Sequence, residues 1–349
     1  MKNILLFRLS AMGDVALTVP IIRAAAEANP QDHFTLVTRP FFAPFFEGIE
    51  NLSLVFPDLK GKHKGTLGLI KFFFELKAQK RWDIVLDLHD VIRTRIWRTL
   101  FRLNRTSVFI IDKGREEKKK ILKRKSSTPL KHVTERYLEV FHKAKIQTAP
   151  LEVTAIRPNP MAKEKARKLL SKWGTKNDIF IGIAPFAMHD PKMWGIENCR
   201  KLMDLVQQKY QVKFLLFGGG KEETTQLEAL HNEHDGRFNM AGKYSFAEEI
   251  AMISSLDIMI AMDSSNMHIA ALTGTKTISI WGGTDPIFGF SAFGQPEAYS
   301  IHIPHGKLKC RPCSIYGAKP CSEEEIFCMK YVTPSLVLNR LEEQGLLYS

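Results

Sequence analysis

The stretch around Asp263 has the residue types and the order that could bind a phosphate group. The apolar run Ile258–Met262 stops at Asp263, and Ser264 and Ser265 then open a short Ala-rich segment that Gly274 closes. This order predicts a strand followed by a helix, with Asp263 at the N-cap. The first N–H groups of a helix lack partners within it and lie at the positive end of its dipole, so they suit a phosphate. The alternative is an ordinary capped crossover helix in a parallel sheet.

Two other polar residues follow predicted strands and could join a site. Asp14 comes soon after the apolar run Asn3–Arg8, and Lys192 lies in the loop after Ile179–Ala184. In parallel α/β sheets, ligands bind beyond the carboxyl ends of the strands, so both positions are well placed. For Asp14 the alternative role is that of a helix N-cap.

Two further motifs at strand ends do not predict a cofactor or a metal. We interpret Asp87, His89 and Asp90 as turn or cap residues, since no matching metal ligands are evident near them. Gly218–Gly220 also follows a strand, but its spacing is not G-x-G-x-x-G, so an NAD or FAD site is not expected.

Four of the five cysteines form a cluster near the C-terminus. Cys310, Cys313, Cys321 and Cys328 have the spacing C-x2-C-x7-C-x6-C, whereas Cys199 lies in a predicted helix as a small buried apolar residue. Clustered cysteines in a cytoplasmic protein favour a structural zinc site over disulfides. Free thiols are the alternative.

Strands and helices alternate along the chain, which indicates two parallel, doubly wound α/β sheets. The predicted strands are Asn3–Arg8, Phe34–Thr38, Ser53–Phe56, Ile84–Leu88 and Ser107–Ile111, then Ile179–Ala184, Lys213–Phe217, Ile258–Met262 and Thr277–Trp281. We expect one domain over residues 1–160, a second over residues 161–332, and over residues 333–349 a helix that packs back across both domains.

The charge balance favours an anionic partner. The 349 residues include 50 Lys and Arg against 37 Asp and Glu, a net charge of +13, and the isoelectric point is near 9.4. Much of the excess lies in Arg93–Lys131, which is either a solvated helix face or an anion-binding surface. Nucleic-acid-binding motifs do not accompany it, so nucleic acid is not expected.

Neither a signal peptide nor a membrane span is predicted, which favours the cytoplasm.

Several motifs occur together in a characteristic order. They are S-x-x-G-D at Ser10–Asp14, K-x-W at Lys192–Trp194, GGGKEE at Gly218–Glu223, D-S-S-x-x-H-x-A-A at Asp263–Ala271 and WGGTDP at Trp281–Pro286. With them the chain resembles glycosyltransferase family 9, the ADP-heptose:lipopolysaccharide heptosyltransferases. The resemblance implies the GT-B architecture, in which two Rossmann-like doubly wound domains face a central cleft. The acceptor then binds the N-terminal domain and the nucleotide sugar the C-terminal one.

The resemblance also implies roles for single residues. Asp14 matches the general base of an inverting reaction, and Lys192 matches a lysine that binds the donor diphosphate. The N–H groups near Ser264 and Ser265 would hold the same diphosphate, although relatives often have Thr-Gly at this point. Asp263 would be repelled by a diphosphate, so it receives a capping and orienting role.

The remaining matched positions concern the nucleoside. His268 lies near the nucleotide or is a core histidine, Glu222 can bind the ribose hydroxyls, and Tyr244 lines the adenine pocket. Stacking on Tyr244 would not select adenine over uracil. Asp285 would face the cleft without an assigned step.

The implied activity is heptose transfer from ADP-heptose to the lipopolysaccharide inner core, either Kdo-lipid A or a heptosylated core. The implied catalysis requires no cofactor. If Zn²⁺ binds the cysteines, its role would be structural. The basic stretch Arg93–Lys131 would support peripheral, electrostatic association with the inner face of the cytoplasmic membrane. Two alternatives stay open: a GT-B transferase with another nucleotide sugar or acceptor, and a non-catalytic protein that binds anionic surfaces or nucleic acid.

Overall fold

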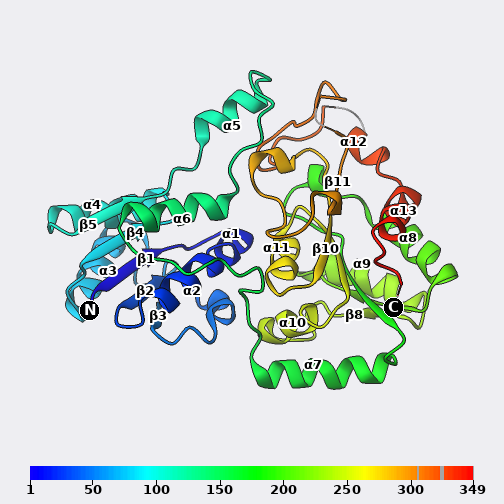
Figure 1. Cartoon of the computed structure of the whole chain (residues 1–349), viewed down its shortest axis with the longest axis horizontal. Helices are drawn as coiled ribbons and strands as arrows, with labels where there is room; N and C mark the ends of the chain where they lie inside the picture. Colours follow the sequence, from blue (N-terminus) through cyan, green and yellow to red (C-terminus); the bar gives the residue numbers. More distant parts are fainter. Residues whose placement is uncertain (305, 323–325, 349) are drawn as a thin grey trace. The chain divides into compact units, whose positions relative to one another are not determined.

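The computed structural model describes residues 1–304, 306–322 and 326–348. The chain forms two compact units (Figure 1). The first comprises Met1–Lys113 and Val133–Arg157, and the second comprises Gly114–His132 and Pro158–Ser349. The segment 114–132 thus belongs to the second unit, although it lies within the range expected for the first domain.

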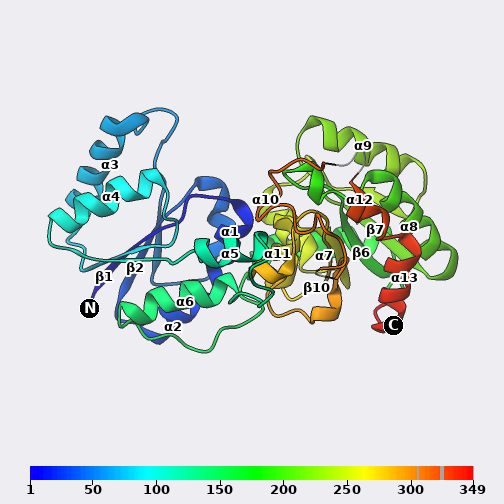
Figure 2. The same cartoon turned by 90° about the horizontal axis from the view of Figure 1, so that it is seen from above.

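The first unit is built on a five-stranded parallel sheet in the order β3-β2-β1-β4-β5. Its strands are β1 Asn3–Phe7, β2 His33–Val37, β3 Leu52–Val55, β4 Ile84–Asp87 and β5 Ser107–Ile110. Its helices are α1 Met12–Ala16, α2 Val19–Ala28, α3 Gly65–Gln79, α4 Ile92–Leu103 and α6 Val133–Lys143, with a 3₁₀ segment η1 at Pro40–Phe46. Figure 2 shows α3 and α4 on one face of this sheet and α2 and α6 on the other.

The second unit has a six-stranded sheet in the order β11-β10-β9-β6-β7-β8, also parallel. Its strands are β6 Ile179–Ala184, β7 Val212–Leu216, β8 Arg237–Asn239, β9 Ile258–Met262, β10 Lys276–Ile280 and β11 Ser300–Ile301. Its helices are α5 Arg115–Leu122, α7 Pro160–Trp173, α8 Ile196–Lys209, α9 Lys221–Asn232, α10 Phe246–Ile253, α11 Ser265–Leu272, α12 Phe327–Lys330 and α13 Pro334–Glu343. Short 3₁₀ segments lie at η2 Asp190–Lys192, η3 Pro286–Phe288 and η4 Glu297–Tyr299.

Alternate residues of the central strands supply one core on each sheet face. In β9, Ile258, Ile260 and Met262 join a buried cluster with residues of α8, α9 and α13. Met259 and Ala261 point to the opposite face and are also fully buried. Strands buried on both faces appear as continuous apolar runs, which is why the sequence pattern located these strands correctly.

Helix α13 belongs to the second unit. Its apolar residues Val337, Leu338 and Leu341 are buried in the core of that unit. It packs against α8, where the buried residues Cys199, Leu202 and Val206 form the apolar stripe of that helix. In the described ranges, no helix is long and apolar enough to cross a membrane.

Candidate functional site

Four adjacent parallel strands carry the predicted donor-site residues to one edge of the second sheet. Lys192 follows β6, Glu222 follows β7, Tyr244 follows β8 and Asp263 follows β9. The strands lie in the order β9-β6-β7-β8 and all run parallel. Their carboxyl ends therefore meet at the same edge, where α/β sheets bind ligands.

The helix after β9 begins one residue later than its sequence predicts. Ser264, in extended conformation, is the N-cap of α11, and its side chain makes no capping hydrogen bond. Among the residues that the structure describes, the buried Ser264 Oγ also has no hydrogen-bond partner. An unsatisfied hydroxyl beside the free N–H groups of a helix terminus is suited to an anionic ligand.

Asp263 does not cap the helix, and this corrects the capping role expected for it. Its Oδ2 atom lies 2.8 Å from Nζ of Lys192 and accepts a 2.7 Å hydrogen bond from Thr284 Oγ1. Nζ of Lys192 also lies 3.4 Å from the carbonyl oxygen of Asp263. The carboxylate turns toward Lys192 because an ion pair with a largely buried ammonium is stronger than a hydrogen bond to one backbone N–H.

The loop that begins at Trp281 packs closely against the loop that carries Lys192. The N–H of Gly283 donates to the carbonyl of Pro191 at 2.8 Å, and the N–H of Cys313 donates to the carbonyl of Gly283 at 2.9 Å. Gly317, whose φ is +89°, lies so close to Lys192 that a Cβ there would be 2.6 Å from Cε. The lysine stem is therefore confined between two loops, with 15% of the side chain exposed.

Asp285 is a structural residue in this loop rather than an exposed site residue. Its Oδ2 atom lies 2.6 Å from Nη1 of Arg311, and both side chains are buried. Arg311 also donates to the carbonyls of Gly282 and Thr284 at 2.8 and 2.9 Å. Burial lowers the pKa of Arg311, and Asp285 opposes this effect. Sequence reasoning missed Arg311 and Thr284, although the TDP motif marks the position of Thr284.

The predicted nucleoside residues differ in their surroundings. Glu222 is exposed in the first turn of α9, and Tyr244 is half-buried just before α10. Burial raises the pKa of the Tyr244 hydroxyl. His268 is buried within α11, with 7% of its surface exposed. Glu222 and Tyr244 thus present side chains at the same sheet edge as Lys192, whereas His268 lies inside the helix layer.

A second candidate site lies at the carboxyl end of β1 in the first unit. Asp14 is in α1, with its side chain 38% exposed, and its Oδ2 atom lies 2.7 Å from Nη2 of Arg8. Arg8 is buried and also donates from Nη1 to the carbonyl of Leu88 at 2.7 Å. Tyr137 contacts both residues, since its hydroxyl donates to the Asp14 carbonyl at 3.3 Å and its ring lies 5.7 Å from the Arg8 guanidinium. Sequence reasoning missed Arg8, which orients the carboxylate.

The residues after β4 form a turn beside this site, as expected. Asp87 Oδ1 accepts hydrogen bonds from the N–H groups of His89 and Asp90 at 3.0 and 2.8 Å. Arg98 pairs with both carboxylates, at 2.9 Å from Asp87 and 2.8 Å from Asp90. Burial first, and then Arg8 and Lys113, lower the pKa of His89 to about 3. A neutral imidazole therefore lies near Ser10 Oγ, at 3.4 Å.

The four C-terminal cysteines influence one another but are not arranged as a zinc site. Burial raises the pKa of Cys328 to about 11, with further contributions from Cys310, Cys313 and Cys321. The described residues contain no group of three or more His, Cys, Asp or Glu that could hold a metal ion. All four cysteines carry thiols rather than disulfides, as does Cys199. The structure therefore does not assemble the zinc site that the spacing predicts.

Comparison with known proteins gives consistent matches. The sequence model described as glycosyltransferase family 9 (heptosyltransferase) matches residues 70–319. The lipopolysaccharide core heptosyltransferase OpsX of Haemophilus influenzae is 25% identical over 296 residues, which are 82% of this chain and 80% of that protein.

Solved structures of the family share the fold. The family 9 glycosyltransferase of Veillonella parvula matches with a TM-score of 0.77 at 21% identity, covering 100% of this chain and 98% of that one. The Escherichia coli heptosyltransferase WaaC, solved with ADP-2-deoxy-2-fluoro heptose, matches with a TM-score of 0.66 at 16% identity, covering 98% and 99%. The predicted GT-B class, with two Rossmann-like domains, is confirmed. Since the family model covers well over half of the sequence, the chain belongs to glycosyltransferase family 9 and is a glycosyltransferase.

Proposed function

We propose that the protein transfers heptose from ADP-heptose to a hydroxyl of the lipopolysaccharide inner core, with inversion at the anomeric carbon. The observation that carries the donor half is the cluster of Lys192, Asp263 and Ser264 at the carboxyl edge of the second sheet. The relative OpsX is a lipopolysaccharide core heptosyltransferase, and WaaC has been solved with an ADP-heptose analogue. Both relatives support this class of acceptor and donor.

On the donor side, the diphosphate would bind between the N-terminus of α11 and the Lys192 ammonium. The backbone N–H groups after Ser264 and the unpartnered Ser264 hydroxyl supply donors, and Lys192 supplies a positive charge. As the anomeric C–O bond breaks, the bonding electrons pass to the phosphate oxygen. Preorganised donors and a cation stabilise that charge without reorganisation.

Lys192 is paired with Asp263 before the donor binds. The confined lysine stem keeps Nζ near the start of α11, and the Asp263 carboxylate holds it there. We propose that the ammonium shares its hydrogen bonds between Asp263 and the diphosphate. Asp263 is therefore a positioning residue, while Glu222 and Tyr244 would contact the ribose and the adenine.

On the acceptor side, Asp14 would act as general base. The acceptor oxygen forms the new bond to the anomeric carbon and loses its proton to the Asp14 carboxylate. Arg8 binds Oδ2 at 2.7 Å, which fixes the orientation of the carboxylate. The neutral imidazole of His89 adds no charge to this surface.

We also propose that the enzyme works at the inner face of the cytoplasmic membrane, where a lipid-linked acceptor is located. The net charge of +13 favours association with anionic lipid and with a phosphorylated core. The basic stretch is divided between the units, since α4 lies in the first and α5 in the second.

The test is an assay of purified protein with ADP-heptose and Kdo-lipid A, following ADP release and the mass of the lipid. A mass gain of one heptose is the expected result. ADP-heptose binding without transfer to any core acceptor would contradict the acceptor assignment. Release of UDP from a UDP-sugar, in place of ADP from ADP-heptose, would favour the alternative transferase. If the protein neither bound nor transferred any sugar donor, the non-catalytic alternative would be favoured.

A further inference from the structure

Helices α3 and α4 each carry a second apolar stripe beside their core face, and the core of the first unit leaves a large part of it exposed. In α4, Trp97 and Phe101 face the core, and in α3, Leu69, Phe72 and Leu76 do so. The additional stripes have helical spacing and consist of Ile92, Ile96, Leu100 and Leu103 on α4 and Leu67, Ile70 and Phe74 on α3. Ile96 and Leu100 pack against the edge of the core, whereas Ile92, Leu103, Leu67 and Phe74 are exposed. A surface helix needs one apolar stripe to join a core, so these exposed residues are available to another partner.

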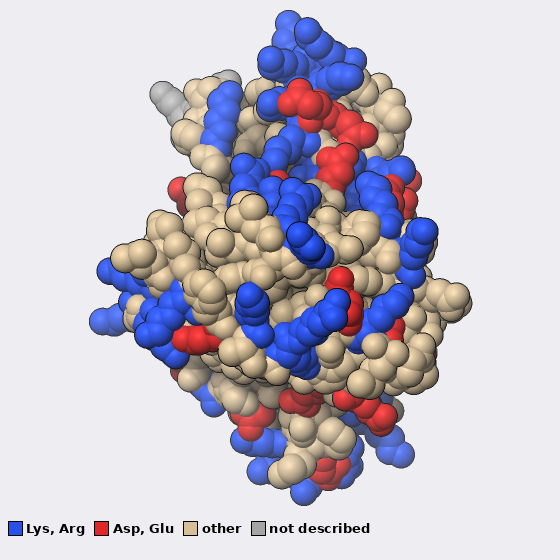
Figure 3. Space-filling model, turned by 90° about the vertical axis from the view of Figure 1, so that its left-hand side faces the viewer, with Lys and Arg blue, Asp and Glu red and all other residues tan. Residues whose placement is uncertain are grey.

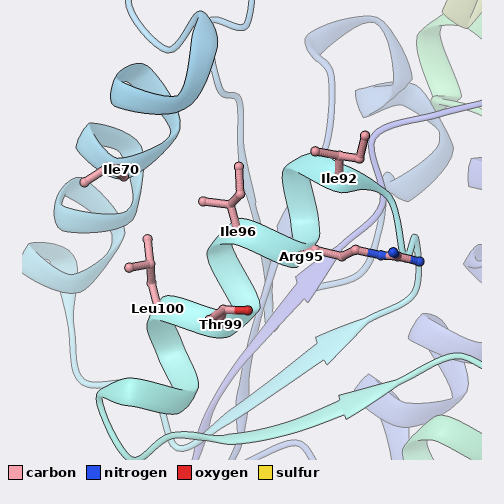
Figure 4. A pocket seen from close by; sticks show the side chains of 6 residues that line it. All are labelled: Ile70, Ile92, Arg95, Ile96, Thr99 and Leu100. Atoms are coloured by element: carbon pink, nitrogen blue, oxygen red, sulfur yellow. The ribbon is translucent and has the colours of Figure 1, made fainter.

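The two stripes meet in an open groove. Its volume is about 370 Å³, and it is lined by Ile70, Ile92, Arg95, Ile96, Thr99 and Leu100 (Figure 4). Ile92, which lines the groove, is 77% exposed, and beyond the groove Leu103 and Leu67 are 77% and 83% exposed. Side chains this apolar are rarely left in water as a contiguous patch unless the patch binds something.

Basic side chains border this apolar surface. Helix α4 has the sequence IRTRIWRTLFRL, with four arginines and no acidic residue. Arg95 and Arg98 are paired with Asp90, whereas Arg93 and Arg102 are exposed, as are Lys71 and Lys77 on α3. Figure 3, which views the side of the first unit where α3 and α4 lie, shows uncharged surface bordered mainly by Lys and Arg.

We propose that the α3–α4 surface docks on an anionic lipid bilayer, with Ile92, Leu103 and Leu67 entering the interface. An apolar stripe flanked by Lys and Arg is the composition that lies in the plane of a membrane interface. The long basic side chains bury their stems beside apolar groups and keep their charges at the lipid phosphates. A second copy of the chain fits less well, because two arginine-rich surfaces would face each other across a two-fold axis.

This surface deepens the proposed function, because it would give the enzyme a specific orientation on the membrane that holds its acceptor. The purpose of the docking rests on the proposed function, but the docking itself does not. Binding to vesicles requires neither donor nor acceptor. The lipid surface and the transferase activity can therefore fail separately in experiment.

The test is co-sedimentation of the whole chain with vesicles of phosphatidylethanolamine and phosphatidylglycerol, compared with vesicles of phosphatidylcholine alone. The wild type is expected to bind the anionic vesicles, and Ile92→Ser with Leu103→Ser is expected to weaken this binding at least about tenfold. Arg93→Gln with Arg102→Gln is expected to weaken it and to reduce its dependence on salt. ADP release with a delipidated, soluble acceptor is expected to stay unchanged in both double variants.

Matched controls lie in the second unit. Met161, which is 83% exposed, gives Met161→Ser as the apolar control, and Lys168→Gln with Lys172→Gln on α7 gives the charge control. Neither is expected to alter vesicle binding. Equal binding of the wild type and the Ile92→Ser, Leu103→Ser variant would overturn the proposal, as would equal binding to neutral vesicles. A dimer in solution that this variant dissociates would assign the surface to a second copy and overturn it as well.

Discussion

The ammonium of Lys192 lies 2.8 Å from the carboxylate of Asp263, although the two residues are separated by 71 positions in the chain. Both side chains are largely buried, at 15% and 10% exposure. The pair occupies the start of α11, where we propose that the donor diphosphate binds. A negative charge is therefore already present beside the cation that must bind a second anion.

Asp263→Asn tests this arrangement through stability. The variant keeps the shape but leaves a largely buried ammonium without its counter-charge, which we expect to lower the free energy of unfolding by about 2 kcal/mol. A bound diphosphate would replace the lost charge. We therefore expect ADP to raise the Tm of Asp263→Asn by more than that of the wild type in thermal unfolding scans. An equal rise of the Tm in both proteins would show that ADP does not bind beside the Lys192–Asp263 ion pair.

Lys192→Met tests the same site through affinity. Methionine preserves the apolar stem between the two loops and removes the charge, so the affinity for ADP is expected to fall at least about tenfold, as measured by calorimetry. Lys172→Met on the exposed face of α7 is the matched control and should leave the ADP affinity unchanged. Wild-type affinity in Lys192→Met would contradict the assignment.

Asp14→Asn tests the acceptor side. The amide can still accept a hydrogen bond from Arg8 but cannot take a proton, so kcat is expected to fall by about 10²- to 10⁴-fold with little change in the KM for the donor. Because the variant also removes the counter-charge of the buried Arg8, its Tm is expected to fall, so kcat is compared at a temperature at which both proteins are folded. Glu135→Gln, an exposed carboxylate on α6, is the control. Full activity in Asp14→Asn would show that another group accepts the proton.

The central strands were predictable because their residues are largely apolar, whereas the short strands β8 and β11 were not predicted. The run Ile258–Met262 coincides with β9, and Ile179–Ala184 coincides with β6. Helix α4 lies within the basic stretch for which a solvated helix face was one of two interpretations, but its bounds were not predicted, because its arginines dominate the sequence and Trp97 and Phe101 supply few core positions. Local periodicity identifies a buried strand more easily than a basic helix with a narrow core face.

The site was predictable only in part, because its geometry depends on distant partners. The position of Asp263 after β9 predicted a cap, but the carboxylate instead binds Lys192 and Thr284 from two other loops. The spacing of the four cysteines predicted zinc, yet the described loop does not bring three ligands together. Motif order locates such residues at strand ends, but only tertiary contacts decide which atoms they bind.

Two adjacent glutamates on α10 are expected to respond oppositely to pH. Burial raises the pKa of Glu249 to about 7. Hydrogen bonds from Lys165 and Ser245 lower the pKa of Glu248. The folded state thus retains the proton of Glu249 above the pH at which the unfolded chain loses it, so stability falls as pH rises from about 4.5 to 7. The ionised Glu248 carboxylate contributes to the free energy of unfolding above about pH 4.5, and this contribution is lost as pH falls through its lowered pKa.

Thermal unfolding of the two glutamine variants measures this difference. At about pH 8, Glu249→Gln is expected to unfold at a higher temperature than the wild type, by a gain on the order of 2 kcal/mol that shrinks toward pH 5. Glu248→Gln is expected to be less stable at about pH 8, by less than about 1 kcal/mol because its ion pair with Lys165 is partly exposed. A Tm difference between Glu249→Gln and wild type that stays constant from pH 5 to about pH 8 would contradict the raised pKa, since an uncharged glutamine cannot follow the titration of the carboxyl.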